Sequence, residues 1–259
     1  MPEGHTIHRE ARDQRAMVTG KPCLVSSPQG RFADGARLLD GATCETVEAL
    51  GKHLLYRFQG DRTLHIHLGL FGRIRKRKVP PAEPRGAVRV RLESPTHVVD
   101  INGPTICEIL DPAERESLFA RIGPDVLRAD ADPDRAFHRI SRSRAPIGRL
   151  IMDQSVMAGI GNIYRTEILW RQRLHPDLPG RDIDRSVFDR LWSDAVTLLA
   201  LGVKRNAIIT VDNPPKTRKG GERFNIFGKD ECPSCRTSIQ RIEIDNRRAF
   251  LCPACQSLP

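Results

Sequence analysis

The sequence predicts an α+β protein with more than one domain, and three observations support this fold class. Between residue 21 and about residue 110, short β-branched and apolar runs alternate with turn residues, which favours a β-sandwich or barrel. After about residue 134 the apolar residues recur at helical spacing, which predicts a helical second half. Four cysteines in two CxxC pairs near the end of the chain predict a zinc-binding β-hairpin.

The composition bounds the class of protein. The 259 residues suffice for one large or two modest domains with real cores, since 39% of them are hydrophobic. The formal net charge of +10 favours a polyanionic partner, although ribosome-associated and membrane-surface proteins are also basic. No apolar run approaches the roughly 18 residues of a membrane span, and charges such as Glu3 and Arg9 leave no signal peptide. We therefore expect a cytoplasmic, monomeric protein that does not associate with membranes.

The N-terminal half is expected to contain one helix followed by strands. Residues 4–17 combine many charges with Ile7 and Ala11 on one face, which predicts a short amphipathic helix capping the β-sandwich. Seven runs then have the composition of strands: CLV at 23, ATCETVEAL at 42, HLLYRF at 53, TLHIHLGLFG at 63, AVRVRLE at 87, HVVDI at 97 and TICEIL at 105. Lys52 lies in the middle of this strand pattern, where an exposed position is the ordinary interpretation of a cation.

A boundary is predicted in the Pro- and Asp-rich stretch at residues 123–134, and helical patterning follows it. The helical runs are RAFHRISRS, PIGRLIMDQ, NIYRTEILWRQRL and RSVFDRLWSDAVTLLALGV. Residues 206–222 contain NPPKTRKGGE, which predicts a mobile basic loop. We expect three domains, at residues 1–127, 128–221 and 222–259.

The cysteine pairs are the most specific signal in the chain. CPSC at 232–235 and CPAC at 252–255 are separated by sixteen residues, a length that suits a hairpin bringing four thiolates into tetrahedral zinc coordination. We therefore predict one structural zinc ion held by Cys232, Cys235, Cys252 and Cys255. The other three cysteines stand alone in strand-like runs and are expected to be buried, inert thiols. The hairpin carries Arg247 among other arginines, which suits either a nucleic-acid groove or a solvated charged surface.

Two glycine-flanked stretches are candidates for nucleic-acid contact. Gly159 and Gly161 precede a helix predicted to start near Asn162, an arrangement that binds phosphate but that also serves as an ordinary helix cap. Leu70 and Phe71 lie between two glycines, where a turn would hold them outward. An exposed apolar tip can insert into a base stack, whereas packing at a hairpin end is the commoner fate.

The first residues offer a nucleophile. Removal of the initiator methionine would leave Pro2 as an N-terminal secondary amine, and an α-amine has an ordinary pKa near 8, so more of it is unprotonated than of a lysine. Glu3 beside it can shuttle protons. An amine that attacks an aldehyde or aminal carbon forms an iminium, although MPE is also a common start without chemical meaning.

Together these motifs resemble the bifunctional DNA glycosylases of the formamidopyrimidine-DNA glycosylase and endonuclease VIII family, and the resemblance covers nearly the whole chain. It comprises the N-terminal PEG, GKHLLY, HLGLFG, the MDQSVMAGIGNIYRTEILW block, FNIFGK and the terminal RRAFLCPAC. The resemblance implies a helix-two-turn-helix in the second domain and DNA lying in a basic cleft between the domains. It also implies a base excision repair enzyme that works on damaged duplex DNA at the bacterial nucleoid.

The resemblance assigns a role to each matching residue. Pro2 would form a Schiff base with C1′ of the damaged nucleotide, and Glu3 would donate and shuttle protons. Lys52 would contact phosphate and assist β-elimination. Asn162 would bind the phosphate backbone, and Arg247 would grip phosphates beside the everted base and take part in δ-elimination.

The same resemblance leaves the gap-filling residues and the lesion open. Leu70 and Phe71 are the candidates to fill the gap left by the flipped base. The PEG start and the EILW helix favour the endonuclease VIII branch and oxidised pyrimidines, but Thr6, Gly69 and Gly148 depart from the family pattern. The alternatives are an enzyme acting mainly on abasic sites or oxidised purines, and a zinc-containing nucleic-acid binder of the same fold without catalysis.

Overall fold

The computed structural model describes residues 2–80, 82–213 and 222–258, and its chain divides into two compact units. Unit 1 comprises the residues up to Glu3 together with Ile7–Arg121, and unit 2 comprises Gly4–Thr6 together with the residues from Ile122 onward. The predicted three-domain division, with limits at residues 127 and 221, stays a prediction.

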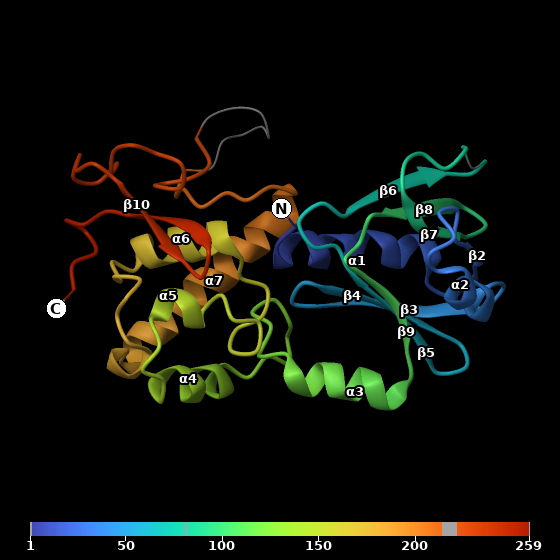
Figure 1. Ribbon diagram of the computed structural model, residues 1–259, viewed down its shortest axis with the longest axis horizontal. Helices are drawn as coiled ribbons and strands as arrows, with labels where there is room; N and C mark the ends of the chain where they lie inside the picture. The colour runs from blue at the N-terminus through green and yellow to red at the C-terminus, as the bar shows by residue number, and fades with distance from the viewer. Residues whose placement is uncertain (1, 81, 214–221, 259) are drawn as a thin grey trace. The chain divides into compact units, whose positions relative to one another are not determined.

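Unit 1 is a helix-capped β-sandwich, as predicted (Figure 1). Its five-stranded antiparallel sheet has the order β1 (Lys21–Pro22), β3 (Thr43–Leu50), β4 (His53–Phe58), β5 (Arg62–His67) and β9 (Ile106–Leu110). The four-stranded antiparallel sheet has the order β2 (Leu24–Ser26), β7 (Val88–Glu93), β8 (His97–Asn102) and β6 (Arg73–Lys78). The helices are α1 (Gly4–Val18), α2 (Ala33–Leu39) and α3 (Pro112–Arg121).

The core of unit 1 joins α1 to both sheets. Ile7 and Ala11 of α1 are buried in one cluster with Leu54 of the five-stranded sheet and Ile101 of the four-stranded sheet. The helical spacing that predicted α1 therefore marks its buried face, and in Figure 1 the helix runs between the two layers.

Three features of unit 1 differ from the sequence-based prediction or were not part of it. The placement of Lys52 in the middle of a strand is wrong, because Gly51 takes a left-handed φ of 58° and the two residues form the turn between β3 and β4. The helices α2 and α3 were not predicted. Neither was β6, because its run RIRKRK has the composition of a solvated segment, which an edge strand tolerates.

Unit 2 is helical and ends in the predicted hairpin. Its elements are α4 (Pro133–Ser141), α5 (Ile147–Leu150), α6 (Asn162–Arg171), the 3₁₀ turn η1 (Gly180–Asp182), α7 (Arg185–Arg205), β10 (Gln240–Ile244) and β11 (Arg247–Leu251). Asp132 caps α4 by accepting from the amides of Asp134 and Arg135. Asp245 and Asn246 both have positive φ, which closes the β10–β11 hairpin tightly.

The predicted mobile basic loop falls partly on residues 214–221, which lie outside the described residues. The flanking residues 206–213 and residue 222 form no helix or strand. Within the described ranges, no helix has both the length and the hydropathy that a membrane span requires.

Candidate active site and nucleic-acid interface

The proposed nucleophile and proton donor stand at the start of α1. Pro2 is half-buried, and Glu3 is the N-cap residue of the helix with an extended backbone, φ −114° and ψ 177°. The Glu3 side chain is fully buried. This carboxyl group directly follows, in the chain, the amine that Pro2 would expose, so it is placed to exchange protons with it.

The residue that follows Glu3 is held by a close backbone contact. Gly4 donates its amide to the carbonyl of Gly159 over 2.8 Å. A Cβ at Gly4 would lie 2.6 Å from the Cα of Gly159, and Gly159 itself has φ +97°, so the glycines of PEG and of GIGN meet where no side chain fits. The constraint acts one residue away from Glu3.

The next residue is a buried histidine. The His5 ring packs edge-on against Tyr164, with ring centroids 5.4 Å apart, and its Nε2 lies 3.2 Å from the hydroxyl of Thr6. Burial lowers the pKa of His5 to about 4, so the ring is neutral at pH 7. Thr6, at the position where the sequence departs from the family, is thus a partner of this ring.

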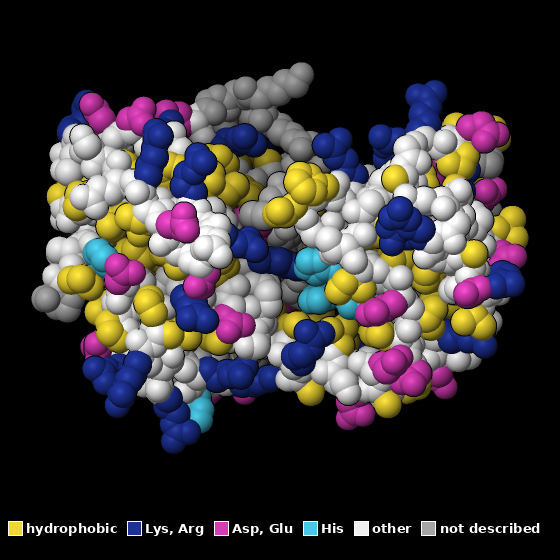
Figure 2. All heavy atoms as spheres, viewed as in Figure 1, with side chains coloured by type: hydrophobic (Ala, Val, Ile, Leu, Met, Phe, Trp, Pro, Cys, Tyr) yellow, Lys and Arg dark blue, Asp and Glu magenta, His cyan; other side chains and the backbone are white. Residues whose placement is uncertain are grey.

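A chain of hydrogen-bonded side chains begins at His53, the residue after Lys52, and continues through His65 to Glu108. His65 Nδ1 lies 2.9 Å from a carboxylate oxygen of Glu108, so this nitrogen carries the proton. His65 Nε2 therefore accepts from His53 Nδ1 at 2.8 Å. The His67 ring lies 5.0 Å from that of His53, and histidine side chains form one group on the face shown in Figure 2.

The histidine group is electrically neutral at physiological pH. Burial, reinforced by the neighbouring histidines, lowers the pKa of His53 to about 3, and burial also lowers the pKa values of His65 and His67. Sequence reasoning missed this group. Its signal was the alternation HIH in a predicted strand, but the pairing of β5 with β4 and β9 was needed to bring the partners together.

The Leu70–Phe71 tip is exposed, as its glycine flanks predicted. The two side chains are 54% and 86% exposed. Gly69 has φ +63°, and Gly72 donates to the carbonyl of Leu68, so the tip is a tight turn. These side chains are available for stacking, and their exposure excludes core packing of this turn, which joins β5 of one sheet to β6 of the other.

Asn162 is the first residue of α6 and links the helix to the zinc hairpin. Its Nδ2 donates to the carbonyl of Arg248 over 2.8 Å, and its Oδ1 accepts from the buried guanidinium of Arg165. Arg247, the proposed phosphate-gripping residue, is exposed beside Arg248 at the start of β11. The structure thus places Asn162 and the hairpin that carries Arg247 in direct contact.

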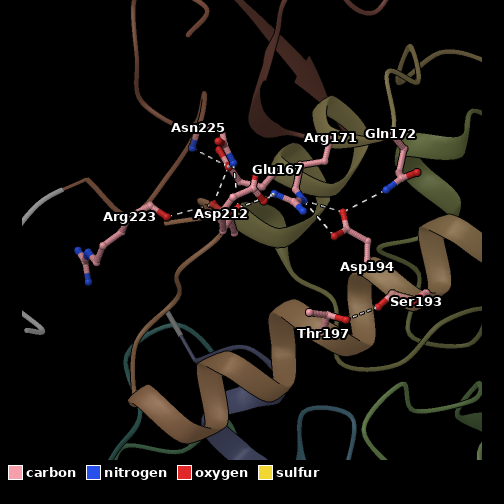
Figure 3. Close-up of polar contacts among 10 residues, drawn as sticks. Glu167, Arg171, Gln172, Ser193, Asp194, Thr197, Asp212, Arg223 and Asn225 are labelled. Atoms are coloured by element: carbon pink, nitrogen blue, oxygen red, sulfur yellow. Dashed lines mark hydrogen bonds and ion pairs between the residues drawn. The ribbon is translucent and has the colours of Figure 1, made fainter. Parts of the chain in front are cut away.

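The carboxylate of Glu167 is a second link from α6 to the C-terminal segment (Figure 3). It is fully buried and accepts from the hydroxyl of Thr210, from the amides of Ile226 and Phe227, and from both the backbone and the side chain of Asn225. One turn later Arg171 donates to the carbonyl of Thr210. Sequence reasoning missed Glu167, because its partners lie more than forty residues away in sequence.

The four predicted zinc ligands form one cluster. Their Sγ atoms lie within 4.8 Å of one another, with separations of 3.5 Å between Cys235 and Cys252, 3.5 Å between Cys235 and Cys255, and 3.9 Å between Cys232 and Cys255. Tetrahedral Zn²⁺ with Zn–S bonds of about 2.3 Å requires sulfur separations near 3.8 Å. The donor set therefore fits one structural zinc ion.

The three remaining cysteines are shielded thiols. Cys23 and Cys44 are fully buried, and burial raises their pKa values to about 11 and about 12. Cys107 is half-buried in β9, and burial raises its pKa to about 12 as well. A thiol with such a pKa is a poor nucleophile and a poor metal ligand at neutral pH.

We expect Glu167→Gln to lower the free energy of unfolding of unit 2 by roughly 3 kcal/mol. Glutamine keeps the shape but turns one of the accepting oxygens into a donor, which then faces buried N–H groups. Trp170 and Trp192 both lie in unit 2, so urea unfolding followed by tryptophan fluorescence measures the change. The exposed Glu243→Gln in the same unit is the control, and equal stability of the two variants would contradict the role of Glu167.

We expect the stability of unit 1 to fall as pH decreases below about 6.5. The pKa of His53 is depressed from 6.5 to about 3 on folding, so between these values the unfolded chain binds the extra proton. The contribution is fully present above pH 6.5, and roughly 2 kcal/mol is lost between pH 7 and pH 5. Urea unfolding followed by far-ultraviolet circular dichroism at the two pH values measures this loss.

His53→Gln should weaken that pH dependence, since glutamine can still donate to His65 but does not titrate. The exposed His138→Gln on α4 should leave it unchanged. Identical pH dependence in His53→Gln and the unmodified protein would show that His53 is not its source.

Metal analysis should find about one zinc per chain, and Cys232→Ser should lose it. Because zinc organises the hairpin, we expect this variant to bind DNA at least 10-fold more weakly while the circular dichroism of unit 1 persists. Cys107→Ser, outside the cluster, should keep both zinc and DNA affinity. Undiminished DNA affinity in Cys232→Ser would argue against a binding role for the hairpin.

Comparison with known families assigns each part of the chain. Residues 1–104 match the formamidopyrimidine-DNA glycosylase N-terminal domain, residues 122–213 match the formamidopyrimidine-DNA glycosylase H2TH domain, and residues 229–258 match the zinc finger found in FPG and IleRS. The fold also matches a solved structure of Lactococcus lactis Fpg with a TM-score of 0.83 over 99% of this chain and 100% of that chain, at 20% identity.

Comparison with individual proteins gives the same result over the full length. The chain is 42% identical to "Endonuclease 8 1" of Mycobacterium tuberculosis, covering 99% of this chain and all of that protein. It is 30% identical to the formamidopyrimidine-DNA glycosylase of Chloroflexus aurantiacus, covering 99% of this chain and 96% of that protein. The zinc cluster, the matched domains and this full-length identity agree, and the chain belongs to the formamidopyrimidine-DNA glycosylase and endonuclease 8 family of DNA repair glycosylases.

Proposed function

We propose that this glycosylase is bifunctional: it excises oxidised bases, preferentially pyrimidines, from duplex DNA and then cleaves the strand as an abasic-site lyase. The observation that carries the proposal is the pair Pro2 and Glu3 at the start of α1, followed directly by the Gly4–Gly159 contact. Because the backbones of Gly4 and Gly159 are in direct contact, the backbone has little conformational freedom at the residue that follows Glu3. Such restriction supports catalysis, since a large part of catalysis is the positioning of reacting groups.

The chemistry begins once the initiator methionine is removed. The Pro2 nitrogen attacks C1′ of the damaged nucleotide, the N–C1′ bond forms, and the bond from C1′ to the base breaks. Glu3 supplies the proton that the departing base requires and takes the proton that the Pro2 nitrogen loses. It passes this proton to the ring oxygen as the C1′–O4′ bond breaks, which leaves the open-chain iminium. The resulting iminium makes the adjacent sugar C–H acidic, so β-elimination expels the 3′ phosphate and δ-elimination the 5′ phosphate, leaving a one-nucleotide gap.

The remaining site residues have separate roles in this proposal. Lys52, at the β3–β4 turn, contacts phosphate and assists β-elimination. Asn162 at the start of α6 and Arg247 on the hairpin hold the DNA backbone, and their elements are joined by the Asn162–Arg248 hydrogen bond. The exposed Leu70 and Phe71 fill the gap left by the everted base.

Two of the departures from the family pattern, Gly69 and Gly148, lie where the surrounding atoms leave little room for a side chain. A Cβ at Gly69 would lie 2.4 Å from the methyl group of Thr105, and Gly69 has a positive φ, so the gap-filling role passes to the two apolar residues after it. A Cβ at Gly148 would lie 3.0 Å from Pro176, so a long side chain there is unfavourable. Lactococcus lactis Fpg has been crystallised with oxidised-pyrimidine DNA, which supports testing pyrimidine lesions first.

Borohydride trapping tests the proposed nucleophile. With abasic DNA and borohydride, the protein should become covalently linked to the strand, and Pro2→Gly should reduce the trapping rate by at least 100-fold. The exposed Pro95→Gly is the control for loss of a proline elsewhere in unit 1. Trapping of Pro2→Gly at the native rate would show that the secondary amine of Pro2 is not required for the reaction.

Glu3→Gln and a lesion panel separate the two activities. Since an abasic site has no base to protonate, Glu3→Gln should slow release of a damaged base more than trapping of abasic DNA. Duplexes with thymine glycol, dihydrouracil, 8-oxoguanine or an abasic site rank the substrates. Cleavage of the abasic duplex alone would reduce the protein to a lyase, and the absence of any cleavage or trapping would make it a DNA binder.

A further inference from the structure

The strand β6 carries a dense run of cations that the proposed catalytic site does not use. Five of its six residues, all except Ile74, are lysine or arginine. The strand directly follows the exposed Leu70–Phe71 turn. Lysine and arginine side chains project from the part of the molecule in Figure 2 where Figure 1 shows β6.

The two faces of β6 differ in the partners of their side chains. Ile74 packs against the core of unit 1, and Lys76 on the same face forms ion pairs with Glu10 at 2.9 Å and Asp13 at 3.2 Å. Residues 73, 75 and 77 alternate with these and lie on the opposite face of the strand. Lys76 is therefore neutralised by α1, and the other face carries arginines only.

The three arginines on that face lack acidic partners within the part of the chain that the structure describes. Arg75 donates to the carbonyl of Arg85, which leaves its charge uncompensated. Asp100 is the cross-strand neighbour of Arg75, but both its oxygens accept from Arg91, at 2.6 and 3.0 Å.

Some exposed arginines elsewhere in unit 1 are ion-paired, and others, such as Arg31 and Arg62, have no acidic partner among the described residues but are single cations in their segments. Arg37 pairs with Asp34, and Arg57 pairs with Glu45 at 2.9 Å. In β6, by contrast, three arginines lie at alternate positions on one face of a single strand, so their like charges add to a local positive potential that favours a polyanion.

The spacing of the arginines indicates which anion this is. Side chains at alternate positions of a strand are about 6.6 Å apart, which is of the same order as the distance between successive phosphates along one nucleic-acid strand. A single metabolite phosphate would need converging side chains. A row of parallel arginines on a sheet edge suits a row of phosphates.

We propose that Arg73, Arg75 and Arg77 form a phosphate track that binds the DNA backbone on one side of the lesion. The proposal rests on the proposed function for its geometry, because Leu70 and Phe71 occupy the gap at the lesion and β6 leads away from them over about 20 Å. The track binds phosphodiester groups without reading sequence and adds about three phosphate contacts to those of Asn162 and Arg247.

The test measures affinity and its salt dependence with a 25-base-pair duplex carrying one tetrahydrofuran abasic analogue, which the enzyme cannot cleave. Replacing all three arginines with alanine should weaken binding by 10- to 100-fold near 0.1 M salt. The slope of log affinity against log salt should become shallower by about 2 to 3, because each lost phosphate contact contributes about 0.9. The Arg31→Ala, Arg37→Ala, Arg57→Ala triple variant changes net charge equally and should lose less than 3-fold.

Two further measurements keep the result interpretable. Replacing the three arginines with lysine should restore most of the affinity, since the track acts through charge; a loss as large as that of the alanine variant would overturn the proposal. Borohydride trapping of abasic DNA by the Arg31→Ala, Arg37→Ala, Arg57→Ala variant should proceed at the native rate, because these residues lie outside the proposed track and outside the proposed catalytic residues. Failure of the unmodified protein to trap would overturn the proposed catalysis alone, whereas equal losses in the β6 and control triple variants would overturn the phosphate track alone.

Discussion

The buried carboxylate of Glu167 organises unit 2, because a charge removed from water is stable only where donors replace its hydration. Here five hydrogen bonds do so, and three of them come from the backbone amides of residues 225–227, which lead into the zinc finger. The helix that carries Glu167 begins five residues earlier at Asn162, whose side chain donates to the carbonyl of Arg248. The zinc finger is thus attached to α6 at two places: through residues 225–227, which precede it, and through Arg248 of its second strand, β11. The relative position of Asn162 and Arg247, the two proposed backbone-binding residues, follows from these attachments and from the zinc cluster.

A second constraint is the absence of side chains where Gly4 meets Gly159. In the sequence, PEG and GIGN are two short motifs more than 150 residues apart, and each has an ordinary explanation as a chain start or a helix cap. In the structure they are one contact, in which the amide of Gly4 reaches the carbonyl of Gly159 and a methyl group on Gly4 would collide with the backbone. The constraint lies within unit 2, because Gly4–Thr6 belong to that unit together with Tyr164 and Gly202, and the space for His5 between them is also small. The chemistry proposed for Pro2 therefore depends on residues that carry no reactive group.

The parts of the fold that the sequence predicts are those whose causes are local. The cysteine spacing predicts the zinc cluster, and the apolar face of residues 4–17 predicts α1, because each pattern lies within one segment. Lys52 was misplaced because a turn of only two residues, Gly51 and Lys52, interrupts an otherwise continuous strand pattern. The strand β6 escaped prediction because an edge strand can consist of cations. Glu167 and the His53–His65–Glu108 chain could not be found, since their partners are set by strand register and helix packing rather than by neighbours in sequence.

The turn that precedes β6 also limits how the enzyme can treat the lesion. The methyl group of Thr105 occupies the space that a side chain at residue 69 would need, so the exposed tip consists of Leu70 and Phe71. Apolar side chains can fill a gap and stack, but they form no hydrogen bonds with the base opposite the lesion. If these residues fill the gap as proposed, discrimination between opposite bases must come from elsewhere, and the tip favours lesions that already weaken the duplex. Insertion of apolar side chains contributes no base-specific affinity for DNA. Contacts with the DNA phosphates then supply affinity for DNA irrespective of the base, which is the role proposed for the arginines that follow the tip on β6.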